Sequence, residues 1–161
     1  MVATIRRTAG VSESGSSARV RIATVTYRST RGHFAARFVD RPKTATMRFA
    51  VDGRTVSAYL AIDAKAKEIV AGYAFAPALP ADAVRNALRG GLTGMARGAQ
   101  VGDVVEGSYE GHPSITATLA NGSGDPARVI LYAYSGSRFY MLAARDDATL
   151  ALLESRFRTT D

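Results

Sequence analysis

The chain has 161 residues, 47% of them hydrophobic and 22% charged, a balance typical of one soluble globular domain. It has no cysteine, which excludes disulfides, thiolate metal ligands and cysteine nucleophiles. No apolar run approaches the roughly 20 residues of a membrane-spanning helix, so no membrane span is expected.

The net charge of +7 is concentrated towards the N-terminus. The first 44 residues hold nine basic and two acidic residues, whereas basic and acidic residues balance in the remainder. A solvated edge with a loose tail would have this composition. A patch that binds a polyanion or an acidic membrane surface would have it too, and both interpretations stay open.

Residues 1–17 are expected to form a flexible leader, because they include six glycine and serine residues and few of their side chains could join a core. Residues 18–161 are predicted to form a single domain. Its first strand, residues 18–24, alternates apolar side chains with Arg19 and Arg21. A second strand follows the turn at residues 31–32 and stops before Pro42, which lacks a backbone donor.

A hairpin is predicted at Asp52-Gly53, between the alternating runs 47–51 and 56–62. Both turn positions favour positive φ there, which matches the twist of paired strands. Residues 68–75 are expected to add another strand to the same sheet.

A helix is predicted at residues 82–98, where apolar residues recur at three- and four-residue steps from Val84 to Met95. Glycines four apart, such as Gly90 and Gly94, would give this helix a smooth stripe. We expect that stripe to let the helix lie close on a sheet.

In the last third of the chain, the pattern of apolar residues predicts four strands, at residues 101–107, 115–119, 129–134 and 139–144. The last two are apolar on both faces, as in central strands. Asp146 is expected to cap a final helix whose apolar face ends at Phe157.

The sequence assembles no recognisable catalytic constellation. His33 and His112 both lie in predicted turns, and two histidines with scattered carboxylates make a poor metal set. Phosphate-binding glycine loops are absent, so no cofactor is expected. A small hydrolase that pairs His112 with a serine and an acid is the least favoured alternative.

Several segments, in their order and spacing, carry a resemblance to a known family. They are Val25-Thr26-Tyr27-Arg28-Ser29 before Gly32, Phe34-Ala35-Ala36-Arg37-Phe38, Tyr109-Glu110-Gly111-His112-Pro113, Arg138-Phe139-Tyr140-Met141-Leu142 and Ser155-Arg156-Phe157. Together they resemble the PsbP-like family, which includes the extrinsic photosystem II subunit, Ran-binding Mog-type proteins and bacterial envelope proteins. The resemblance covers residues 25–158. It implies an α+β fold, an α/β/α sandwich around a mainly antiparallel sheet, with no shared catalytic residues.

We therefore expect a non-catalytic interaction module, not an enzyme, that binds another protein and is associated with the envelope of a high-GC bacterium. A removed leader would make the protein extracytoplasmic; without one it would be cytoplasmic. The alternative is a nucleic-acid or polyanion binder that uses the basic first quarter. The candidate partner-binding residues are Arg19, Arg21, Arg37, His112 and Arg138.

Overall fold

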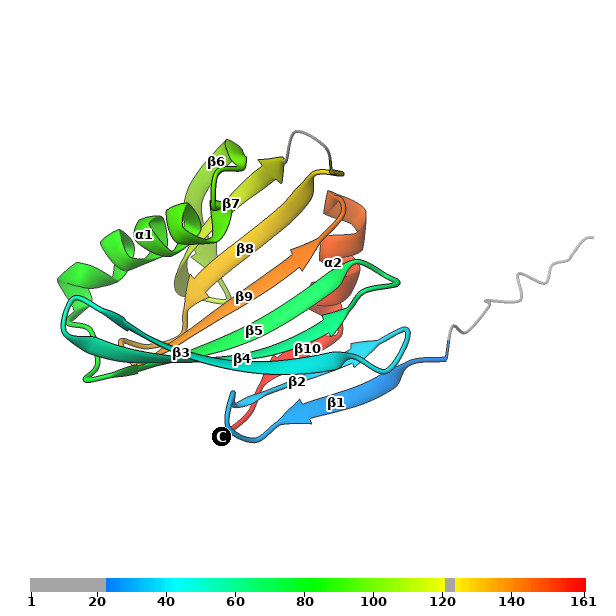
Figure 1. Cartoon of the computed structure of the whole chain (residues 1–161), viewed down its shortest axis with the longest axis horizontal. Coiled ribbons are helices and arrows are strands. Elements are labelled where there is room, and N and C mark those ends of the chain that lie inside the picture. The colour runs from blue at the N-terminus through cyan, green and yellow to red at the C-terminus, as the bar shows by residue number, and fades with distance from the viewer. Residues whose placement is uncertain (1–22, 121–123) are drawn as a thin grey trace, which may run out of the picture.

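The computed structural model describes residues 23–120 and 124–161, whose strands form two antiparallel sheets (Figure 1). The expected leader, Arg19 and Arg21 lie outside the described residues, as do residues 121–123 of a predicted turn. These expectations therefore stay predictions.

The main sheet has seven strands in the order β3-β4-β5-β9-β8-β7-β6. Their bounds are β3 (Lys43–Val51), β4 (Arg54–Asp63), β5 (Glu68–Ala76), β6 (Gln100–Tyr109), β7 (His112–Ala120), β8 (Ala127–Ala133) and β9 (Arg138–Ala144). The small sheet has the order β1-β2-β10, with β1 (Val25–Ser29), β2 (Phe34–Phe38) and β10 (Phe157–Thr159). The helical elements are the short 3₁₀ turn η2 (Ala81–Ala83), α1 (Val84–Ala96) and α2 (Asp147–Ser155). Within the described ranges, neither α-helix has the length and apolar character needed to cross a bilayer.

Two-residue turns fix the register of two hairpins. Asp52 and Gly53 have φ of 48° and 74°, and Glu110 and Gly111 have φ of 49° and 82°. Positive φ at both positions is the geometry of a type I′ turn, whose twist matches that of paired strands. The hairpin predicted at Asp52-Gly53 is confirmed.

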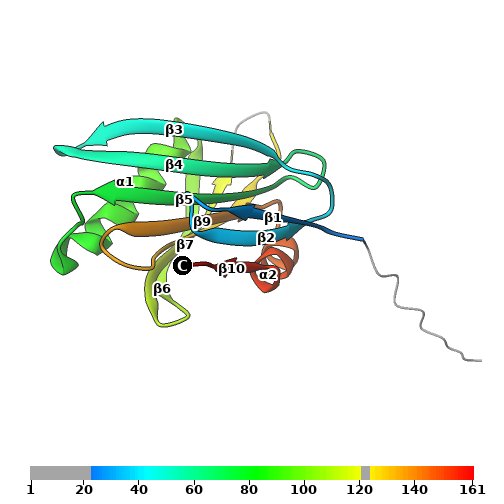
Figure 2. The same ribbon diagram turned by 90° about the horizontal axis from the view of Figure 1, so that it is seen from below.

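Different layers cover the two faces of the main sheet (Figure 2). Helix α1 lies over β7 and β8, where Leu88 and Leu92 pack with Leu131. On the opposite face, α2 and the small sheet pack on the centre of the sheet, where Phe34 contributes to the same cluster as Leu142. Strands β8 and β9 are largely buried, as expected for strands covered on both sides.

The fold is therefore mainly β, and the expected α/β/α sandwich describes it only in part. One outer layer is largely the small sheet, not helix. The predicted last helix begins as expected, because the Asp146 side chain accepts a hydrogen bond from the Thr149 backbone N–H at 2.7 Å. Its predicted end at Phe157 is wrong: α2 ends at Ser155, and Phe157 begins β10, where it pairs with Ala36.

The glycines of α1 behave differently from the sequence expectation. A Cβ added at Gly90 or Gly94 would meet nothing within 4 Å, so these two glycines do not line the contact with the sheet. Only Gly91 approaches it, since a Cβ there would lie 3.0 Å from Leu131 Cδ2. The smooth-stripe interpretation is wrong, because the sheet lies under a neighbouring row of the helix.

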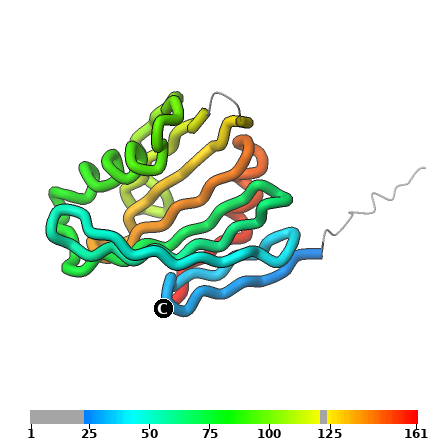
Figure 3. The backbone as a smooth tube through the Cα atoms, in the orientation of Figure 1, coloured from blue at the N-terminus to red at the C-terminus, as the bar shows by residue number. Residues whose placement is uncertain are grey.

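The small sheet lies very close to the main sheet at one point. A Cβ on Gly72 of β5 would come within 2.6 Å of the Gly32 carbonyl oxygen in the β1–β2 turn. Beside it, the Tyr140 hydroxyl donates to the His33 carbonyl at 2.8 Å, and the Thr160 backbone N–H donates to the same carbonyl. The C-terminus consequently lies beside this hairpin (Figure 3).

We predict that Gly72→Ala lowers the free energy of unfolding by about 1–3 kcal/mol, because the added methyl group must displace a backbone carbonyl. Gly94→Ala is the matched control. It adds a methyl group in open space on an exposed helical position and is expected to raise stability by about 0.8–1 kcal/mol. Urea denaturation of the two variants measures both changes, and equal effects would contradict the close approach.

A buried ion pair joins the two sheets. Arg156, which follows α2, donates from Nη2 to Glu68 Oε1 of β5 at 2.8 Å, and the two side chains are 14% and 2% exposed. The Arg156 backbone carbonyl also accepts a hydrogen bond from the Arg37 N–H of β2 at 3.1 Å. One residue thus connects α2, β2 and β5.

We predict that Glu68→Ala costs about 3–5 kcal/mol of stability, because it leaves the Arg156 guanidinium buried without its partner. Glu68→Gln keeps a hydrogen-bond acceptor and should cost less. The control is Lys67→Ala, which removes an exposed pair with Asp125 and should change stability little. A similarly small loss for Glu68→Ala in chemical denaturation would show that the pair does not hold the layers.

Candidate functional site

The candidate partner-binding residues within the described ranges do not form one site. Arg37 is exposed on β2, in the small sheet. His112 and Arg138 begin β7 and β9, and both are partly buried at one end of the main sheet. The structure therefore separates Arg37 from the other two.

His112 belongs to a cluster of aromatic rings. Its ring centroid lies 4.9 Å from that of Tyr134 and 6.2 Å from that of Tyr132, and Tyr132 lies 5.5 Å from Tyr140. Among the described residues, no serine or carboxylate makes a hydrogen bond with His112. The local geometry is that of a ring packed on tyrosines.

Three tyrosines of this end of the sheet, Tyr109, Tyr132 and Tyr140, are unsuited to act as bases at neutral pH. Burial raises the pKa of Tyr109 to about 12, and burial likewise raises the pKa values of Tyr132 and Tyr140. The buried Tyr132 hydroxyl has no hydrogen-bond partner in the described part of the chain. These side chains fill and stiffen the end of the core.

Two glutamates flank the cluster. Glu154 of α2 is partly buried, and its pKa is raised, first by burial and second by the nearby charge of Glu110. The folded protein therefore favours the protonated form of Glu154 more than the unfolded chain does. This contribution to stability is complete below the unfolded pKa of about 4.3 and is lost as pH rises through the folded value.

We predict that Glu154→Gln stabilises the protein at pH 7 and has little effect at pH 4, since the amide does not ionise. Glu106→Gln should show the opposite trend, because a hydrogen bond from Arg89 lowers the pKa of Glu106. Urea unfolding at both pH values tests the signs. A Glu154→Gln variant that is less stable than the parent at pH 7 would contradict the assignment.

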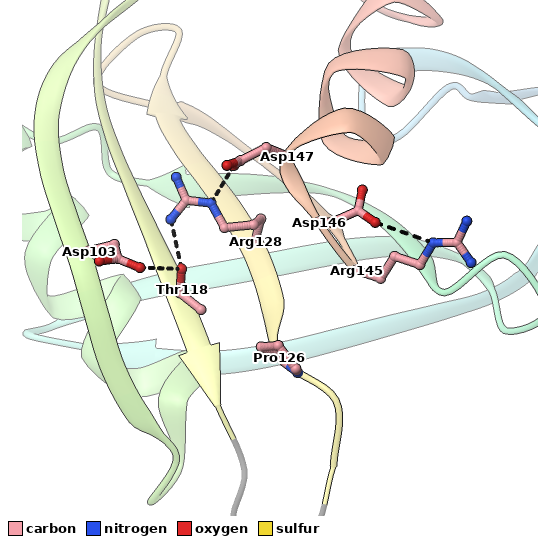
Figure 4. Close-up of a pocket in the computed structure, with 7 residues that line it drawn as sticks. All are labelled: Asp103, Thr118, Pro126, Arg128, Arg145, Asp146 and Asp147. Carbon is pink, nitrogen blue, oxygen red and sulfur yellow. Dashed lines mark hydrogen bonds and ion pairs between the residues drawn. The ribbon is translucent and has the colours of Figure 1, made fainter.

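A polar pocket of about 350 Å³ lies between the ends of β6, β7 and β8 and the start of α2 (Figure 4). Its charged groups bind one another. Arg128 Nε donates to Asp147 at 2.6 Å, Arg128 Nη1 donates to the Thr118 hydroxyl at 2.8 Å, and that hydroxyl lies 3.1 Å from an Asp103 carboxylate oxygen. The charge of Arg128 is therefore already neutralised. These bonds are better explained as structural contacts that hold the start of α2 against β7 and β8.

In residues 23–120 and 124–161, no three histidine, aspartate or glutamate side chains gather into a set able to hold a metal ion.

An apolar surface remains uncovered on the α1 side of the sheet. Met47, Phe49 and Val51 of β3 are 45%, 41% and 41% exposed. They share a face with Val56 and Ala58 of β4, which are buried. We call β3 and β4 together the ribbon. The alternation of apolar residues in the sequence located this face correctly. It could not show that the β3 part of the face is uncovered, because the covering depends on the position of α1.

A second surface was predicted only in part, because the possible basic patch of the first quarter did not include Arg158. Strand β10 brings Arg158 beside Ala35, whose other neighbour is Arg28. These arginines are 130 positions apart in the chain, and the residues around Arg158 read as the end of a helix. No periodic signal in a three-residue strand could have joined them.

The comparisons with known proteins support the fold. No protein-family model and no curated protein matches the chain. The solution structure of cyanobacterial PsbP (CyanoP) from Synechocystis sp. PCC 6803 is similar, with a TM-score of 0.53 over 91% of this chain and 98% of that chain, at 9% sequence identity. The similarity does not extend to the Mog-type proteins named in the sequence resemblance. At this identity it concerns architecture alone, and the chain has a PsbP-like fold.

Proposed function

We propose that this protein is a non-catalytic module that binds another protein through the ribbon. The observation that carries the proposal is the exposure of Met47, Phe49 and Val51 side by side on one strand face. A soluble protein gains little from exposing neighbouring large apolar side chains, and such patches commonly mark interaction sites.

The open edge of β3 adds a second reason. Among residues 23–120 and 124–161, strand β3 pairs with β4 on one side only, and all nine of its residues are exposed. Every second residue therefore directs its backbone N–H and C=O towards the open edge, where a strand from a partner could add to the sheet.

The opposite edge of the sheet is protected. Strand β6 is interrupted by a bulge between Gly102 and Val105, and Asp103 has a φ of 52°. Bulges on edge strands prevent further pairing. Because β3 lacks such a feature, the two edges differ, and β3 is the one suited to a partner.

The PsbP-like fold agrees with a binding role. The hydrolase alternative has less support, since the ring of His112 packs between tyrosines. Envelope association rests on the sequence resemblance and stays a prediction.

The test uses a photoreactive benzoylphenylalanine at Phe49 of the full chain, expressed in the native host. We expect irradiation to give a discrete covalent adduct with a second protein, because the ring lies on the exposed face of the ribbon. The control carries the same group at Leu152 of α2, which is 60% exposed and lies outside the ribbon.

A second variant makes the test specific. Met47→Ser combined with Val51→Ser should abolish the adduct at Phe49 while leaving the unfolding transition nearly unchanged, since both side chains are exposed. An adduct of equal yield from Leu152, or one that survives both serine substitutions, would refute binding at the ribbon.

A further inference from the structure

The outer face of the small sheet carries a second candidate surface. Cross-strand pairing forms two rows through β1, β2 and β10. Tyr27, Ala36 and Phe157 face the core, and the adjacent row of Arg28, Ala35 and Arg158 faces outwards. Because side chains alternate along a strand, Arg37 faces outwards as well, two residues from Ala35. We call Arg28, Arg37 and Arg158 the arginine face.

The arginines of this face are exposed, and none has an acidic partner within 4.0 Å among the described residues. Ala35 lies between two of them and is nevertheless only 3% exposed. The aliphatic stems of the arginines can cover such a small residue and leave the guanidinium groups in solvent. The arginine face therefore carries positive charge that no nearby carboxylate offsets, and the small sheet beneath it is buried at Ala35.

A groove extends the positive surface. A cavity of about 460 Å³ between β1 and the segment before β3 is lined by residues that include Arg28 and Arg41. The two arginines border a space large enough for an anionic group. The nearby Asp40 does not neutralise them, since its carboxylate pairs with Lys65 at 3.4 Å.

The arrangement of the arginines and aromatic rings distinguishes between the possible polyanionic partners. Strands lie about 4.8 Å apart, so Arg28 and Arg158 project from backbones about 10 Å apart on one face of the small sheet. The aromatic rings of the small sheet, from Tyr27, Phe34, Phe38 and Phe157, contribute to the core. Single-stranded nucleic acids are held largely by stacking on successive aromatic rings. The outward row of the small sheet has none, and Tyr27 is the one aromatic residue that lines the adjoining groove in the described part of the chain.

We propose that the arginine face binds the surface of a membrane that contains anionic lipids. An array of unpaired guanidinium groups on one exposed face suits a surface of phosphate headgroups. Each basic residue near such a surface strengthens binding about fivefold. Three arginines together then strengthen binding about 100-fold, which is enough for reversible attachment to the membrane surface. The arginine face and the open apolar side of the ribbon lie on opposite sides of the main sheet, so this proposal does not depend on the protein-binding role.

The experiment measures sedimentation of the full chain with vesicles of phosphatidylcholine alone or with 30% phosphatidylglycerol, on the order of 0.05–0.2 M salt. We expect binding only to the anionic vesicles, weakening as salt rises. Replacing Arg28, Arg37 and Arg158 by glutamine should reduce the partition coefficient about 100-fold. The control replaces Arg48, Arg85 and Arg97, which are exposed elsewhere, and changes the net charge equally.

The matched control distinguishes binding by the arginine face from a general effect of the protein's net charge. Equal losses in both triple variants would overturn the proposal, and so would an absence of binding to anionic vesicles by the parent chain. Lysine at the same three positions should retain most of the binding, which guards against a variant that fails to fold. Tighter salt-dependent binding to a single-stranded or duplex DNA probe than to the vesicles would instead favour the nucleic-acid alternative.

Discussion

The arrangement of the layers depends on the buried ion pair between Glu68 and Arg156. A three-residue strand such as β10 has few backbone hydrogen bonds of its own, so its position must be fixed by its neighbours. Arg156 fixes it through three contacts. Its Nη2 donates to Glu68 of β5, and its Nε donates to the Leu152 carbonyl of α2. Its own carbonyl accepts from the Arg37 N–H of β2. The Arg156 charge is tolerated in the interior because it is paired and hydrogen-bonded. The other carboxylate oxygen of Glu68, Oε2, is buried without a hydrogen-bond partner in the described part of the chain.

The two sides of the main sheet consequently have different chemistry. The side that faces the small sheet is closed by aromatic residues, and the outermost layer there presents arginines to solvent. On the other side, α1 lies over β7 and β8 and leaves apolar residues of β3 exposed. The arginine face and the apolar face of the ribbon are therefore separated by the thickness of the main sheet and the small sheet.

Sequence patterns predicted the parts of the fold that local physics determines. Turn residues with positive φ defined the hairpin at Asp52-Gly53, and apolar runs identified the central strands. The errors arose where distant contacts decide. Phe157 lies at helical spacing from Leu153, yet pairing with Ala36 makes it part of a strand. The candidate surfaces were predicted least well, because Arg28 and Arg158 meet only through that pairing, whereas Arg37 alone could be chosen from sequence.

The bulge in β6 has a consequence for assembly. A sheet with two open edges can add copies of itself without limit, because each added strand exposes another edge. Here the irregular backbone at Asp103 interrupts pairing on one side, so growth could proceed only from β3. Pairing between the β3 strands of two copies would leave the two interrupted β6 edges outermost and would then end the series. The fold thus favours complexes of fixed stoichiometry over open-ended fibres.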